Sequence, residues 1–196
     1  MTAQSWQTLR TKKYQLSLRL FLFLNAISAL FAIAFPIYPS KTVSTPGVLI
    51  LVLSTALLTW HVRYAKKRIN LHVISILFGG LWAVHITLKY QALQNPDYSF
   101  LLIALLTVLF IGSIAFANNI IAFTLHSLPS LLACLSLNGS ENGLRLLYFT
   151  ALPMAGIAIQ HVIQKRYDDF AQQLMFKLLA EKETLTDLSM LDPLTG

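Results

Sequence analysis

Five histidines offer the widest choice of chemistry in this sequence. His61, His72 and His161 fall near the ends of long apolar runs, whereas His85 and His126 lie deeper inside such runs. Neutral imidazole is a common ligand of metal ions and haem, so the first three could share one cofactor if they lie at one depth. No pair of histidines at helical ligand spacing supports that arrangement. Hydrogen bonding to water or lipid headgroups is the simpler interpretation, and we expect no metal site and no cofactor in this chain.

His126 and two prolines are candidates for sensing. A polar side chain at membrane depth usually faces the helix bundle, where His126 could respond to a ligand or only link helices. Pro129 and Pro153 each remove a helical hydrogen bond and can kink a helix, so they could form a flexible pair or serve only in static packing. Ser127 and Ser130 could satisfy the carbonyls that a proline leaves free.

No catalytic constellation accompanies these residues. The sequence has no glycine-rich phosphate loop and no recognisable Ser/His/Asp set, and no acidic residue lies near the middle of an apolar run. The last point disfavours a proton- or cation-coupled transporter. Cys134, the single cysteine, lies within an apolar run and is expected to be a small buried hydrophobe.

The composition predicts a membrane protein. The chain has 196 residues, of which 56% are hydrophobic and 12% charged, against about 25% charged in soluble domains. Of its 15 Lys and Arg residues, 13 occur up to Arg166, placed between apolar runs. That placement is typical of membrane proteins, whereas nucleic-acid binding proteins gather basic residues on one face, so we expect no nucleic-acid partner.

The apolar runs predict an all-α polytopic fold with about six transmembrane helices. Pro46 after Thr45 signals a helix start, and a continuous helix over 100–137 would be about 55 Å long, nearly twice a bilayer core, so we expect a hairpin at Asn118-Asn119. Gly79-Gly80 favours close helix contact. The predicted spans are 18–37, 45–62, 71–88, 100–117, 120–137 and 144–163.

The basic residues also predict orientation. They gather in the N-terminal segment 1–17, in the 63–70 loop and directly after the sixth span, so both termini should be cytoplasmic. Aromatic residues near the ends of the runs are typical of an interfacial belt. They are Trp60, Tyr64, Trp82, Tyr90, Tyr98 and Tyr148.

Residues 164–190 carry the heptad pattern of a left-handed coiled coil. Its apolar positions repeat at alternating spacings of four and three residues, with Glu181 as the only charged member. A solvated amphipathic tail is the alternative, because the pattern spans only about three heptads. Pro193 should end the helix. The predicted seam consists of Tyr167, Ala171, Leu174, Leu178, Glu181, Leu185 and Leu188.

The final residues, 191–196, resemble the start of the GGDEF domain of diguanylate cyclases. The family typically begins Asp-x-Leu-Thr-Gly, which is matched by Asp192, Leu194, Thr195 and Gly196 after a helix of the kind that family uses as a signalling linker. The family's catalytic signature, metal carboxylates and guanine-binding residues have no counterpart in these 196 residues. The resemblance implies that Mg²⁺ and GTP belong to a downstream catalytic domain.

The resemblance implies a membrane sensor domain over 18–163 that regulates a diguanylate cyclase, which condenses two GTP into cyclic di-GMP. The expected location is the bacterial inner membrane, with lipid around the helices, a homodimer through the linker and an unknown small-molecule or membrane-derived stimulus. The alternatives are the sensor of a histidine kinase or other output domain, or a small transporter. Leu-Thr-Gly disfavours the kinase, whose linker would lead into a phosphoacceptor histidine motif.

Overall fold

The computed structural model describes residues 3–35, 45–64, 69–93, 97–117, 119–138 and 143–191, and every regular element in these ranges is an α-helix. All six helices are long and apolar enough to cross a membrane. The sequence therefore predicted the helical class and the number of candidate spans correctly. The helices are α1 Ala3–Ala34, α2 Thr45–Arg63, α3 Leu71–Gln91, α4 Tyr98–Ala115, α5 Ile120–Asn138 and α6 Gly143–Leu191.

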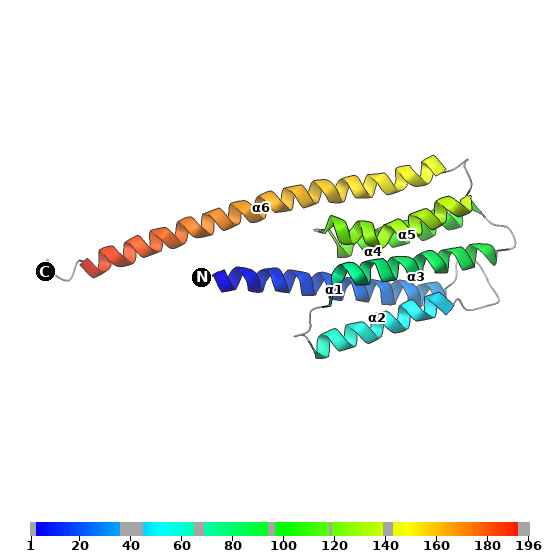
Figure 1. Ribbon diagram of the computed structural model, residues 1–196, viewed down its shortest axis with the longest axis horizontal. Coiled ribbons are helices and arrows are strands. Elements are labelled where there is room, and N and C mark those ends of the chain that lie inside the picture. The colour runs from blue at the N-terminus through cyan, green and yellow to red at the C-terminus, as the bar shows by residue number, and fades with distance from the viewer. Residues whose placement is uncertain are drawn as a thin grey trace.

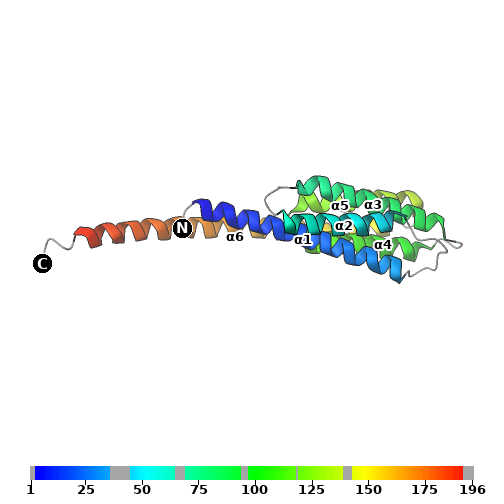
Figure 2. The same cartoon turned by 90° about the horizontal axis from the view of Figure 1, so that it is seen from below.

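The helices run up and down along one common axis (Figure 1). Helices α1 to α5 form a bundle, with α2 on one side and α6 on the other. The longer α6 continues well past the bundle, and the start of α1 projects in the same direction (Figures 1 and 2). The start of α1 and the end of α6 therefore lie toward the same end of the bundle.

Local sequence explains where the inner helices begin. The side chain of Asn70 accepts a hydrogen bond from the backbone of His72 at 3.0 Å, and Asp97 caps α4 through Ser99 at 3.3 Å. Asn119 accepts from the backbone of Ala122 at 3.1 Å at the start of α5. Asx side chains satisfy backbone N–H groups that have no partner within the helix. The predicted break is present, since α4 ends at Ala115 and α5 begins at Ile120 and packs against it, whereas Asn118 lies outside the described residues.

The candidate span within the first helix is Thr11–Ala34, which overlaps the predicted span, and the helix itself is longer. The span was expected over 18–37, but α1 begins at Ala3 and ends at Ala34. No glycine or proline interrupts 3–34, so the helix includes the polar segment that we had treated as separate from it. Pro36 disfavours helical geometry at Phe35, which accounts for the earlier end.

Helices α3 and α5 form the closest pair in the bundle. A methyl group at Gly79 would lie 2.3 Å from the carbonyl oxygen of His126, so only glycine permits this backbone approach. At Gly80 a methyl group would meet nothing within 4 Å. The expected close contact at the glycine pair is therefore confirmed for one of its two members.

Candidate functional site

The segment 164–190, predicted from its heptads to be a linker, falls on the distal part of α6. The helix is continuous from Gly143 to Leu191, which is about 74 Å at 1.5 Å per residue. A bilayer core of about 30 Å accounts for less than half of that length. About 40 Å of helix is thus left to carry the seam beyond the bundle.

The seam of α6 is exposed in the single chain. Tyr167 is 66% exposed, Leu178 57% and Leu185 67%, and Ala171, Leu174 and Glu181 are also exposed. Phe170 and Phe176, which lie off the seam, are similarly exposed, so pairing through the seam stays a prediction. The side chain of Leu188 lies outside the described residues, as do Asp192, Leu194, Thr195 and Gly196 of the GGDEF-like motif.

One ion pair ties the start of this linker to the first helix. The amine of Lys13 lies 3.2 Å from the Asp168 carboxylate, which also accepts a hydrogen bond from Gln164 at 3.1 Å. Within the bundle, α6 packs against α5 and α4. Movement of α1, α4 or α5 can therefore reach α6 through direct contacts.

His126 lies at the centre of the bundle and is fully buried. The ring of Phe21 meets it edge-on at 4.9 Å between centroids, and Phe116 lies 6.2 Å away. A methyl group at Gly112 would lie 3.2 Å from its ring. This packing makes His126 a core residue that links α5 to α1 and α4. Its proposed sensing role stays a prediction.

The two prolines lie inside continuous helices, Pro129 in α5 and Pro153 in α6. The sequence predicts that Ser127 and Ser130 satisfy the carbonyl that Pro129 leaves free, but neither hydroxyl donates to it. Ser127 donates to the carbonyl of Phe123 at 2.8 Å, and Ser130 donates to that of Gly79 at 3.4 Å. Ser130 thereby links α5 to α3 where their backbones approach. A flexible role for the prolines remains untested.

The remaining histidines do not assemble a metal site. Within the described residues, no group of three or more His, Cys, Asp or Glu side chains could hold a metal ion. His61, in the last turn of α2, is buried, and its ring nitrogens have no hydrogen-bond partner in the part of the chain that the structure describes. Joint ligation by His61, His72 and His161 is therefore not supported.

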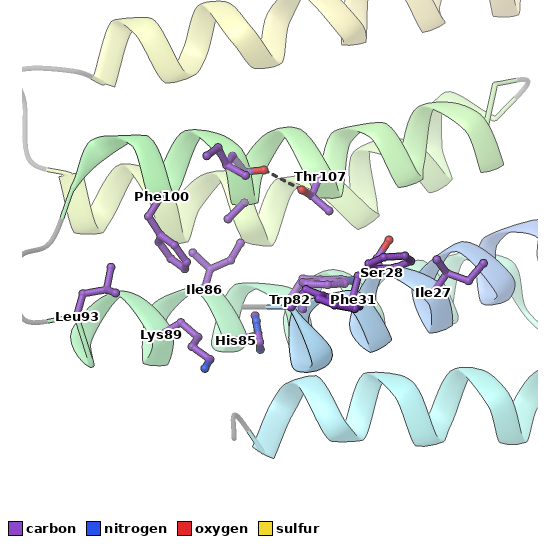
Figure 3. Close-up of a pocket in the computed structure, with 14 residues that line it drawn as sticks. Ile27, Ser28, Phe31, Trp82, His85, Ile86, Lys89, Leu93, Phe100 and Thr107 are labelled. Carbon is purple, nitrogen blue, oxygen red and sulfur yellow. Dashed lines mark hydrogen bonds between the residues drawn. The ribbon is translucent and has the colours of Figure 1, made fainter. Parts of the chain in front are cut away.

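Instead, the structure presents an apolar pocket between α1, α3 and α4 (Figure 3). Its volume is about 420 Å³. The floor comes from α3, where Trp82, His85 and Ile86 are all buried. The rim comes from α1 and α4, where Phe31 and Ile103 are exposed. The pocket therefore opens sideways between α1 and α4, toward the medium that surrounds the bundle.

The polar atoms of this pocket lie mainly along α3. His85 and Lys89 are one helical turn apart, and their side chains extend on the same side of α3 in Figure 3. The ring of His85 lies against Gly47 of α2, where a methyl group would come within 3.1 Å. The hydroxyl of Thr107 donates a hydrogen bond to the carbonyl of Ile103 at 2.9 Å. His85 and Lys89 thus form one polar edge on an otherwise apolar cavity.

Sequence reasoning missed this pocket and misplaced Trp82. The indole was expected in an interfacial belt, but Trp82 is 4% exposed and donates to the Asn25 side chain at 2.8 Å. The Asn25 amide donates in turn to the carbonyl of Phe21 at 2.8 Å. A buried asparagine in an apolar run was the available signal, because it needs partners. Trp60 and Tyr148 are exposed, as a belt requires.

Comparison with protein-family models, with curated proteins and with solved structures finds no match for this chain.

Proposed function

We propose that this chain is a membrane-embedded sensory domain that controls a diguanylate cyclase through α6. The observation that carries the proposal is the single helix that begins in the bundle and continues about 40 Å beyond it with an exposed heptad seam. Apolar residues at heptad spacing favour a parallel helix pair in water. The GGDEF-like residues after this helix support the identity of the output.

The mechanism follows from dimer geometry. A cyclase that joins two GTP molecules needs two catalytic domains face to face, and a paired α6 would hold them at high local concentration. Rotation or register shift of the pair would decide whether they meet. A stimulus needs only a few kcal/mol of preference for one arrangement to shift the balance.

Glu181 provides the adjustable element of this linker. It is exposed in the single chain and occupies a seam position, where two carboxylates would face each other in a dimer. Their repulsion weakens pairing and keeps the linker responsive. Replacement by leucine removes the repulsion and adds apolar contact, so Glu181→Leu should stabilise one arrangement.

The test compares Glu181→Leu with Glu183→Leu, a nearby substitution that also removes a carboxylate but lies off the seam. The chain is expressed together with whatever its gene encodes after Gly196, and cellular cyclic di-GMP is measured. We expect cyclic di-GMP synthesis whose level changes with Glu181→Leu and not with the control. Absence of synthesis would exclude the cyclase. A phosphorylated histidine downstream would instead identify a kinase, and solute uptake a transporter.

A further inference from the structure

The pocket between α1, α3 and α4 has the features of a ligand site rather than a packing defect. Cavities that enclose small ligands measure about 300–1,000 Å³ and combine apolar walls with a few placed polar groups. This pocket, of about 420 Å³, has one polar edge formed by His85 and Lys89. Its floor is built from buried side chains, so the cavity is part of the bundle and not a surface dimple.

The position of the opening indicates where a ligand comes from. Phe21 of α1 and Phe116, which directly follows α4, lie 4.6 Å apart between ring centroids and fill the space between these two helices in the interior of the bundle. The pocket occupies another part of the same two helices, with Phe31 and Ile103 at its exposed rim. In a bilayer this rim faces acyl chains, so an apolar molecule can enter from the membrane without crossing water.

The charged residues that line the pocket indicate which class of ligand it would bind. None of the 14 lining residues is acidic, and the Lys89 ammonium lies in the last turn of α3, where the helix ends. A lysine in the last turn of a membrane-spanning helix favours an anionic group at the level of the lipid headgroups. From Leu93 to Trp82 the pocket extends about 16 Å along α3, at 1.5 Å per residue. That length accommodates the carboxyl half of one extended chain, and the rest of the chain would lie at the open rim between α1 and α4.

We propose that the pocket binds a single-chain amphiphilic carboxylate, with its head on Lys89 and His85 and its chain over Trp82 between α1 and α4. A long-chain fatty acid has this chemistry, whether it is released from membrane lipid or taken up from outside. Binding does not depend on the proposed output. Only its transmission to α6, through the contact of α4 with α6, rests on the proposed function.

Trp82 provides a direct readout of occupancy. The chain contains three tryptophans, so Trp6→Phe with Trp60→Phe leaves Trp82 as the only indole. The purified chain in neutral detergent is titrated with a brominated fatty acid, because bromine quenches an indole that it contacts. We expect saturable quenching that palmitate reverses. A variant that keeps only Trp60, which faces outward, reports partition into detergent and should show no saturation.

The matched variants test the head and chain contacts separately. Lys89→Met should weaken binding about 10- to 100-fold, the range of a hydrogen bond to a charged group. Arg145→Met removes an exposed charge outside the pocket and should change nothing. Ala104→Phe should block the chain, with Ala32→Phe on the opposite wall as its replacement if that variant does not fold.

Each outcome decides the proposal. Palmitate methyl ester should bind about tenfold more weakly than palmitate or worse, and equal binding would refute an anionic head. Equal quenching of Trp82 and Trp60 would refute the site. Saturable quenching by brominated phosphatidylglycerol that palmitate does not reverse would assign the pocket to bulk lipid and overturn the proposal. A chain that forms no α6 dimers but whose Trp82 is still quenched saturably would refute only the output mechanism and not the binding site.

Discussion

Substitution of Gly79 by alanine should separate α3 from α5. The added methyl group would lie 2.3 Å from the carbonyl oxygen of His126 and 3.0 Å from its carbonyl carbon, whereas ordinary contacts begin at 3.4 Å. The helices must therefore move apart by roughly 1 Å, because backbone cannot rotate away as a side chain can. Overpacking of this kind costs about 1–3 kcal/mol, and a backbone clash favours the upper part of that range.

Gly80→Ala is the matched control, since a methyl group there meets nothing within 4 Å. Both substitutions gain about 1 kcal/mol of helix propensity, so this contribution cancels in the comparison. The difference between the variants should therefore be the overpacking cost alone. For a chain of this size it corresponds to about 2–4 °C in Tm for each kcal/mol.

The assay is thermal unfolding of both variants in one detergent, followed by helical circular dichroism. We expect Gly79→Ala to unfold several degrees below Gly80→Ala. Equal midpoints would mean that the backbones do not approach at Gly79, and the reasoning about the α3 and α5 pair would be wrong.

Three other predictions address topology, core and activity. Reporter fusions after Thr42, Gln94 and Glu141 should all lie outside the cytoplasm, and a cytoplasmic signal at any of them would break the six-span topology. Asn25→Leu should destabilise the chain by about 1–3 kcal/mol in thermal unfolding, because it removes the acceptor of the buried Trp82 indole. An unchanged midpoint would show that this bond contributes nothing. The 196-residue chain alone should synthesise no cyclic di-GMP from GTP, and any product would refute the assignment of catalysis to a downstream domain.

Local signals predicted the helices well because apolar length and caps act over a few residues. Thr45, Asn119 and Gly143 mark helix limits that agree with the predicted runs within two residues. The N-terminal limit of α1 could not be predicted from such signals, because residues 3–17 are polar but contain no glycine or proline that would break a helix. Judged by hydropathy alone, these polar residues were placed outside the first helix.

Tertiary relations were beyond the sequence for a physical reason. Nothing local distinguishes Gly79 from Gly80, since their difference lies in which one faces α5. The bond between Asn25 and Trp82 joins residues 57 positions apart. The pocket arises because α1 and α4 lie over α3, and the chemistry of its polar edge follows from two residues on one helix face. Such features depend on helix packing, which no single run encodes.

The proposed dimeric linker is tested most directly by disulfide mapping of α6 in membranes. In a Cys134→Ala background, Leu178→Cys and Leu185→Cys place thiols on the seam, whereas Phe176→Cys and Glu183→Cys place them on the opposite face with the same spacing. The account predicts strong dimer cross-linking at both seam positions and little at the two controls. Equal cross-linking on the two faces, or none on the seam, would contradict it.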